Sequence, residues 1–336
     1  MSRLWLVALF LFQGLHLVHG DALPLVWPTP NRAFIEGKGG DFYLQPTASG
    51  RLESALFGCV RNGGKRFHEG IDLKPLQRTS TGEAADPIFA ISPGRVVYIN
   101  SSAGRSSYGR YIVLEHQHRN VRFYSLYSHL ARIEEGLVVG REVLAGTRIG
   151  TMGRSAGGYS IPKHRAHLHL EIGLQLSSDF ERWFERSSPG SINHHGRWNG
   201  LNLVGFDPLD FYGKVMEGMA VGVADYLTLV PVAVEVRYFS SRFPDLLERS
   251  PGLITGGAGS GKRVAWDIGF TWFGLPVRWT PRFQGEGLEE APTGTLKILR
   301  VNPGEVEKAT CRSILIRDGQ SFRIGEDLRR YIAILF

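Results

Sequence analysis

Between residues 86 and 173 the chain consists of short apolar segments separated by turns that contain glycine. The segments occupy residues 88–91, 95–99, 111–116, 121–127, 138–140, 148–152 and 166–172. Runs of about four to eight residues rich in Val, Ile, Tyr and Phe are typical of β-strands, and such regular turns favour an antiparallel sheet. The polar residues 117–120 connect two segments as a hairpin loop would. The sequence therefore predicts a mainly β fold.

The last of these segments contains two histidines one residue apart, His167 and His169. Side chains at positions i and i+2 of a strand point to the same face, so both histidines share a face while Leu168 and Leu170 pack on the other. Two imidazoles on one face can bind a metal ion and transfer a proton beside it. Such a pair is more often two partly exposed polar positions, so this interpretation needs support from elsewhere in the chain.

His68 and Asp72 precede the apolar segments and lie on either side of Gly70. The glycine argues against a helix and favours a turn that leads into a strand. An imidazole and a carboxylate are both zinc ligands, although this spacing alone often arises by chance. With His169 they make a three-ligand set that leaves one tetrahedral position for water, as a catalytic zinc site requires.

His129 lies where another predicted strand meets a turn. A histidine there fits a proton-transfer role at the open side of a metal, and its alternative is a surface histidine that ends a strand. The combination of five residues within one β-rich segment is far more specific than any part of it. The five residues are His68, Asp72, His129, His167 and His169.

Residues from about Arg66 to Ile172 resemble the catalytic domain of the lysostaphin-type (LytM-type) zinc endopeptidases of bacterial cell walls. Beyond the five residues above, the resemblance rests on residues 86–97, 127–130 and 136–153, which follow the order and spacing of that family's strands and glycines. Residues 206–208 resemble the closing segment of the family's domain more loosely.

The resemblance implies an antiparallel β-sheet catalytic domain with a groove and one Zn²⁺ cofactor. It implies zinc ligation by His68, Asp72 and His169, with His129 and His167 as catalytic histidines. The implied activity is hydrolysis of amide bonds in peptidoglycan peptide cross-links by a zinc-activated water. Two alternatives remain open: a catalytically silent relative that binds the wall or activates another hydrolase, and a zinc peptidase that cleaves protein substrates.

Two loops depart from the common pattern of this family, residues 159–165 and the long segment 174–205. Both can border the groove, so we expect the substrate preference to differ there. We expect His164, His194 and His195 in these loops to face solvent, and His116 and His118 near the hairpin to be exposed.

The sequence suggests four successive regions. They are a signal peptide (1–20), an extended N-terminal arm (21–65), the zinc peptidase domain (66–214) and a C-terminal accessory domain (222–336). The accessory domain is predicted to be α+β or mostly β. Its expected strands are residues 229–238, 263–283, 293–301 and 313–316, with a helix at 243–249 and either a helix or a strand at 324–336. A further helix is expected at 179–186.

The first residues combine Arg3, a short apolar run and small residues near a plausible cleavage point, which is the pattern of a secretory signal peptide. An uncleaved membrane anchor is the alternative. We therefore expect export to the periplasm, the cell wall or the exterior, without stable membrane insertion after cleavage. The formal charge of +7 favours an anionic partner, for which an exported protein would meet peptidoglycan sooner than nucleic acid. Nothing in the sequence indicates the oligomeric state.

Two further features need an interpretation. Cys59 and Cys311 are the two cysteines of the chain, and they can form a disulfide or remain as two buried thiols. Residues 256–263 imitate a phosphate-binding loop, but Arg263 stands where a Ser or Thr would bind magnesium. We interpret this stretch as a flexible glycine-rich turn.

Overall fold

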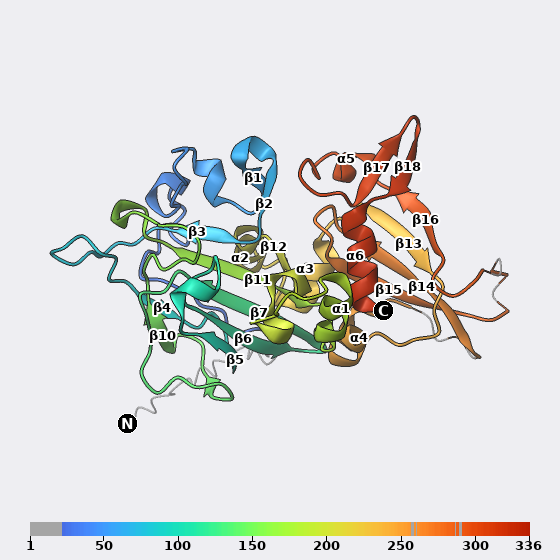
Figure 1. Ribbon diagram of the computed structural model, residues 1–336, viewed down its shortest axis with the longest axis horizontal. Helices are drawn as coiled ribbons and strands as arrows, with labels where there is room; N and C mark the ends of the chain where they lie inside the picture. Colours follow the sequence, from blue (N-terminus) through green and yellow to red (C-terminus); the bar gives the residue numbers. More distant parts are fainter. Residues whose placement is uncertain (1–21, 257–258, 260, 286, 289–290) are drawn as a thin grey trace, which may run out of the picture.

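The structure is a computed structural model that describes residues 22–256, 259, 261–285, 287–288 and 291–336. The expected signal peptide and residues 257, 258 and 260 of the glycine-rich stretch lie outside the described residues. The described part of the chain contains no helix with the length and apolar character that crossing a membrane requires. Two groups of antiparallel sheets lie side by side in Figure 1, one blue to green and the other orange to red. The predicted mainly β, antiparallel fold is confirmed.

The first group surrounds a seven-stranded sheet. The strands of this first group, including those of its smaller sheets, are β1 (Gly58–Arg61), β2 (Arg66–His68), β3 (Ile71–Leu73), β4 (Pro87–Phe89), β5 (Gly94–Asn100), β6 (Tyr111–His118), β7 (Val121–Ser128), β8 (Arg132–Ile133), β9 (Glu142–Val143), β10 (Arg148–Thr151), β11 (Leu168–Gln175) and β12 (Leu203–Phe206). The large sheet has the order β12-β11-β7-β6-β5-β9, and β3 also pairs with β11. Smaller sheets join β4, β10 and β8, and β1 with β2.

Both faces of the large sheet are covered, which is why β11 is buried along its whole length. Leu168 and Leu170 belong to the main apolar core, where α2 (Pro208–Met216) and α3 (Val223–Leu229) also contribute side chains. On the other face, Trp198 and Leu203 pack with residues of β6 and β7. The loop that supplies Trp198 begins with α1 (Phe180–Ser187), close to the helix predicted at 179–186.

The predicted hairpin between β6 and β7 is confirmed, but its loop is shorter than expected. Gln117 and His118 still belong to β6, and His118 pairs with Val121 across the turn. The expectation that His116 and His118 are exposed is wrong, because their side chains are 1% and 8% exposed. Gly94 and Gly222 pack so closely on these two rings that a Cβ atom at either glycine would clash with them.

The second group contains a four-stranded sheet of order β15-β14-β13-β16 and the separate hairpin β17-β18. Its strands are β13 (Val234–Tyr238), β14 (Arg263–Phe270), β15 (Pro276–Phe283), β16 (Leu296–Val301), β17 (Leu315–Asp318) and β18 (Ser321–Ile324). Its helices are α4 (Asp245–Arg249), α5 (Pro303–Val306) and α6 (Glu326–Leu335). The expected strand at 229–238 begins only at Val234, because residues 223–229 form α3 and Pro231 prevents the helix from continuing.

The C-terminal segment, for which the sequence allowed helix or strand, forms α6. Leu328, Tyr331, Ile332 and Leu335 recur at helical spacing and are buried. The core of the second group includes Trp266 and Trp279, whose rings lie 5.9 Å apart edge to face. Figure 1 shows α6 on the side of the second group that faces α1, and these two helices are in contact.

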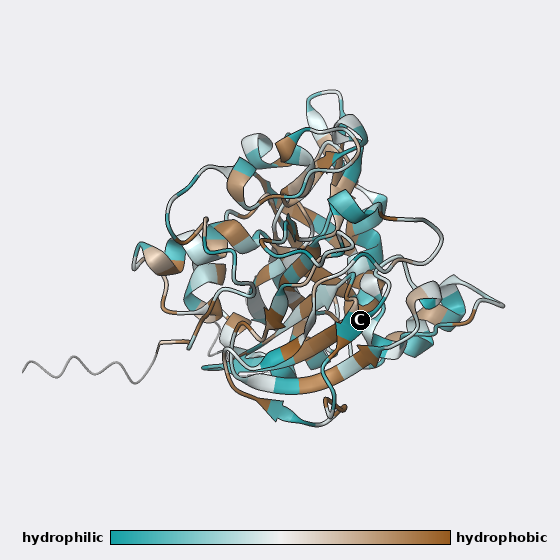
Figure 2. Ribbon diagram, turned by 90° about the vertical axis from the view of Figure 1, so that its left-hand side faces the viewer, coloured by the Kyte–Doolittle hydropathy of each residue, from teal (hydrophilic) through white to brown (hydrophobic). Residues whose placement is uncertain are grey.

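One apolar core extends through both groups of sheets. Figure 2 shows the apolar parts of the ribbon gathered in the interior of the molecule. A disulfide between Cys59 and Cys311, which the sequence left open, also joins the groups, and the Cα atoms of these cysteines are 5.5 Å apart. The two groups are therefore linked by packing and by a covalent bond.

Candidate metal centre and its cavity

Three strands bring His68, Asp72 and His169 together. Asp72 of β3 pairs directly with His169 of β11, and His68 ends β2 just before the turn into β3. Gly70 allows that turn to lie against β11, since a Cβ atom there would come within 2.0 Å of the carbonyl oxygen of Leu170. The turn that the sequence predicted around Gly70 is therefore what places two candidate ligands next to the third.

The three side chains are buried and their metal-binding atoms converge. Nε2 of His68 lies 2.9 Å from Nδ1 of His169, and each of these nitrogens lies 3.1 Å from Oδ1 of Asp72. Ligand atoms of all three residues lie within 4.8 Å of one another. Two imidazole nitrogens and one carboxylate oxygen at this separation are a donor set that zinc accepts.

The far nitrogen of each imidazole has its own partner. Nδ1 of His68 donates to the carbonyl oxygen of Leu56 at 2.7 Å, and Nε2 of His169 donates to Oε1 of Glu171 at 3.0 Å. Such hydrogen bonds fix the ring orientation and leave the opposite nitrogen free to bind a metal. The residues present therefore fit a zinc ion.

The electrostatics of the centre favour a cation. Burial lowers the pKa of His169, but hydrogen bonds to Asp72 and Glu171 outweigh it and raise this pKa to about 9. Burial would raise the pKa of Asp72, yet its histidine neighbours hold it well below the ordinary value. Two carboxylates thus stabilise a positive charge at His169, whether that charge is a proton or a metal ion.

Glu171 is a residue of the candidate centre that the sequence analysis missed. Its carboxylate is 1% exposed and accepts hydrogen bonds from the hydroxyl groups of Tyr108 at 2.5 Å and Tyr124 at 3.0 Å, besides His169. Burial would raise its pKa, but these contacts hold it below the ordinary value. The sequence feature that could have identified it is a charged residue two positions after His169 in an apolar strand, which places both side chains on the same face.

Replacing Glu171 by Gln should weaken zinc binding about 10- to 100-fold, because His169 loses the charged partner that orients its ring. The affinity can be measured by competition with a chromophoric chelator. Glu115→Gln is the matched control, since Glu115 is a half-buried carboxylate of β6 with no contact to the three ligands, and its affinity should equal that of the wild type. Unchanged affinity in Glu171→Gln would show that Glu171 does not support the ligand.

His129 and His167 face the same centre. Their rings lie 4.7 Å apart, and Nε2 of His167 is 3.6 Å from Oδ2 of Asp72. Nδ1 of His129 donates to the carbonyl oxygen of Ser155 at 2.8 Å, and Nδ1 of His167 donates to that of Arg165 at 2.7 Å. His167 directly precedes β11 and bridges to Gly153, so it keeps the orientation expected from the strand pattern.

Burial lowers the pKa of both histidines, and that of His129 lies well below its ordinary value. This shift favours the neutral imidazole, in which Nε2 carries a lone pair when Nδ1 donates its hydrogen bond. His129 has a positive φ of 60°, which is uncommon outside glycine and is concentrated at functional sites. The five residues selected from the sequence thus lie together around one point.

Arg61 is a second residue that the sequence analysis missed. Its Nη2 lies 2.5 Å from Oδ2 of Asp72 and 2.8 Å from Nε2 of His68. This guanidinium therefore lies within the candidate centre itself and also lines the adjoining cavity. No signal in the sequence pointed to Arg61, because it comes from β1 in the N-terminal arm.

The centre opens into a cavity of about 1010 Å³. Both loops that depart from the family pattern border it, through residues such as Tyr159 and Asn199. His164 and His194 are exposed as expected. His195 is half-buried; it lines the cavity and contacts the hydroxyl groups of Tyr98 and Tyr111 at 2.9 and 3.0 Å.

The charge of the cavity wall is mostly positive. Six arginines line it against three carboxylates: Arg51, Arg61, Arg66, Arg165, Arg312 and Arg330 against Glu53, Glu69 and Asp72. Two of these arginines, together with Tyr331, come from the C-terminal part of the chain. The wall therefore favours an anionic ligand.

Comparison with known proteins agrees with this geometry. Peptidase family M23 matches residues 66–178, which include all five candidate site residues. The chain is 39% identical over 95 residues to Lipoprotein NlpD of Yersinia enterocolitica, a match that covers 27% of this chain and 80% of that protein. The chain belongs to peptidase family M23, and the resemblance to lysostaphin-type enzymes is confirmed.

Solved structures of the same kind are also similar in part. The catalytic domain of the antimicrobial peptidase lysostaphin from Staphylococcus simulans is 26% identical, with coverage of 35% of this chain and 74% of that one and a TM-score of 0.26. The catalytic domain of the prophage-encoded M23 protein EnpA from Enterococcus faecalis is 23% identical, with coverage of 39% and 80% and a TM-score of 0.27.

Proposed function

We propose that this protein is an exported zinc metalloendopeptidase that hydrolyses amide bonds in the peptide cross-links of peptidoglycan. The observation that carries the proposal is the convergence of His68, Asp72 and His169 with His129 and His167 around one point. A silent relative would be expected to have lost some of these groups. The positive wall of the cavity agrees with an anionic polymer as substrate.

Zinc would be held by His68, Asp72 and His169. The chemistry that a bound zinc ion supplies at such a site is a lowered pKa for its water and polarisation of a carbonyl group. Glu171 orients His169, and the carbonyl oxygen of Leu56 orients His68. These contacts keep the ligand nitrogens aimed at the centre before a substrate arrives.

His129 and His167 would handle the proton. Because Nδ1 of each ring donates to a backbone carbonyl, Nε2 can accept a proton from the attacking water. A histidine that has taken up this proton can donate a hydrogen bond to the oxyanion or return the proton to the leaving amine. His129 is buried and His167 is largely buried beside the cavity, so these groups would act where water is partly excluded.

Export is supported by the Cys59–Cys311 disulfide, because disulfides persist in oxidising compartments outside the cytoplasm. The predicted signal sequence agrees with this assignment. We therefore place the activity in the periplasm or at the cell wall.

A hydrolase activator without activity of its own is the second candidate. The observation in its favour is Arg61, whose guanidinium contacts Asp72 and His68, two of the three candidate ligands. In such a protein the cavity would bind the wall or another hydrolase, and no bond would be cleaved.

Digestion of dye-labelled peptidoglycan sacculi separates the candidates. The purified protein supplied with zinc should release soluble labelled fragments, and a chelator should stop the release. His164→Ala, which changes an exposed histidine outside the centre, should behave as the wild type. If fragments are released only when a purified amidase is added, and this protein stimulates that release, the activator is favoured. If casein is cleaved and sacculi are not, a protein substrate is favoured.

A further inference from the structure

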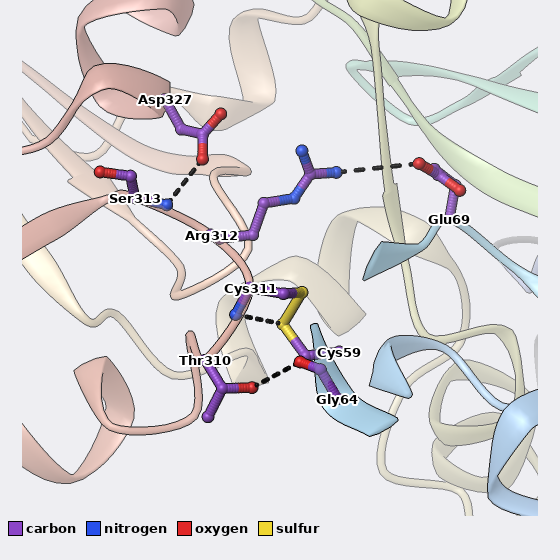
Figure 3. The surroundings of a disulfide bond; sticks show 8 residues. All are labelled: Cys59, Gly64, Glu69, Thr310, Cys311, Arg312, Ser313 and Asp327. Atoms are coloured by element: carbon purple, nitrogen blue, oxygen red, sulfur yellow. Dashed lines mark hydrogen bonds and ion pairs between the residues drawn. A yellow bond between two sulfur atoms is a disulfide. The ribbon is translucent and has the colours of Figure 1, made fainter. Parts of the chain in front are cut away.

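The C-terminal part of the chain touches the hairpin that carries His68. Figure 3 shows residues 310–312 against this hairpin, with the Cys59–Cys311 disulfide between them. The amide nitrogen of Cys311 donates to Sγ of Cys59 at 3.1 Å, and the hydroxyl group of Thr310 donates to the carbonyl oxygen of Gly64 at 3.2 Å. The two segments are thus joined by the disulfide and by two hydrogen bonds at and beside it.

Arg312 contacts the two residues that flank His68. Its guanidinium lies 4.1 Å from the centre of the Phe67 ring, and its Nη2 lies 4.0 Å from Oε1 of Glu69. The side chain of Arg312 is only 19% exposed, so its contact with Phe67 is largely shielded from water, whereas the side chain of Glu69 is 42% exposed. A cation over an aromatic ring gains most when it is desolvated. Arg312 therefore holds the backbone on either side of a candidate metal ligand.

The register of the hairpin transmits these contacts to the metal centre. Gly58 pairs with His68 and Cys59 pairs with Phe67, so the disulfide is one residue away from the strand partner of His68. Leu56, whose carbonyl oxygen orients the His68 ring, lies just before the same strand. Arg61 ends this strand. A shift of β1 would therefore move two groups together: Gly58, which pairs with the candidate ligand His68, and the guanidinium of Arg61.

Aromatic packing from the C-terminal part supports the same hairpin. The ring of Phe57 lies 5.1 Å from that of Phe273, and the ring of Phe67 lies 6.0 Å from that of Trp272. A Cβ atom on Gly58 would come within 3.1 Å of Trp272, so the strand lies directly against this aromatic residue. The hairpin is therefore held from one side by apolar contacts and at its end by the disulfide and Arg312.

We infer that Cys59, Cys311 and Arg312 are positioning residues for the metal centre, through which the C-terminal part of the chain sets its affinity for zinc. The inference rests on the proposed function, since it takes His68 to be a zinc ligand. It gives the C-terminal part a role that its sequence did not reveal. That role is to lock the ligand hairpin in the geometry in which His68 faces Asp72 and His169.

The test measures zinc affinity of the full chain by competition with a chromophoric chelator. The Cys59→Ser/Cys311→Ser double variant and Arg312→Ala should each bind zinc about 10-fold more weakly, as expected when groups outside the ligand set are removed. Arg312→Lys keeps a cation over Phe67 and should restore affinity to within about twofold of the wild type. Circular dichroism spectra establish that each variant is folded.

Asp245→Asn is the matched control. It weakens a different contact between the same two parts of the chain, in which Asp245 of α4 accepts hydrogen bonds from the backbone and side chain of Ser178. This contact does not involve the hairpin, so zinc affinity should stay at the wild-type value. Arg312→Ala keeps the disulfide and serves as the second variant if the double variant does not fold.

The outcomes separate the inference from the proposed function. Wild-type protein that binds zinc tightly, with unchanged affinity in the folded variants and only a lower unfolding temperature, would overturn the inference alone. Wild-type protein that binds no stoichiometric zinc would overturn the proposed function and the inference with it. If Asp245→Asn binds zinc as weakly as Arg312→Ala does, the inference is also overturned, because any weakening of the contact between the two parts of the chain would then lower the zinc affinity.

Discussion

Replacing His169 by Ala is expected to abolish stoichiometric zinc binding and to lower peptidoglycan hydrolysis by about 1,000-fold, or about 4 kcal/mol of transition-state stabilisation. The substitution removes one of three ligands. It also leaves Glu171 buried without its imidazole partner. Zinc content can be measured by mass spectrometry of the metal, and hydrolysis by release of dye from labelled sacculi.

Asp72→Ala is the companion variant, because it removes a ligand from a different strand and leaves the contact between His169 and Glu171 in place. It should lose zinc and activity to the same degree. His164→Ala should keep both. Full activity in either ligand variant, with normal folding, would mean that these residues do not bind the catalytic metal.

Replacing His129 or His167 by Ala is expected to separate activity from metal binding. General acid–base catalysis contributes about 100- to 10,000-fold to a rate, so each variant should lose activity in this range. Neither residue belongs to the three-ligand set, so zinc content should stay at the wild-type level. Rates of dye release and zinc content are measured on the same preparations.

The double variant His129→Ala/His167→Ala adds a check on their cooperation. If the two rings act on the same proton, its activity should fall little below that of the weaker single variant, since residues that act as a unit are not additive. Loss of zinc from either single variant would instead identify that histidine as a ligand, and wild-type rates would remove it from the mechanism.

Much of the centre was predictable because local patterns determine it. The alternation of β11 sends Leu168 and Leu170 into the apolar core and His169 to the opposite face, as the period of a strand requires. The turn at Gly70 follows from glycine in a short segment between two strands. His129 was predictable as the end of a strand. These features depend on neighbours within a few residues, which a sequence displays.

Arg61 and Arg312 were not predictable in the same way. Arg61 lies seven residues before His68, but it belongs to β1, which the sequence analysis had placed in an extended arm, and Arg312 reaches the hairpin from a distant segment through tertiary packing. The burial of His116 and His118 had the same cause, because close packing of Gly94 and Gly222 covers rings that a hairpin alone would expose. The start of β13 was misplaced since a short apolar run favours strand and helix alike.

The most direct test of the proposed function is mass spectrometry of a defined cross-linked muropeptide dimer after incubation with the zinc-loaded protein. We predict that the dimer is converted to two monomers with the addition of one water and with intact glycan, and that His169→Ala leaves it unchanged. A dimer that survives incubation with the wild-type protein, or one cleaved in its glycan part, would contradict a zinc endopeptidase of peptidoglycan cross-links.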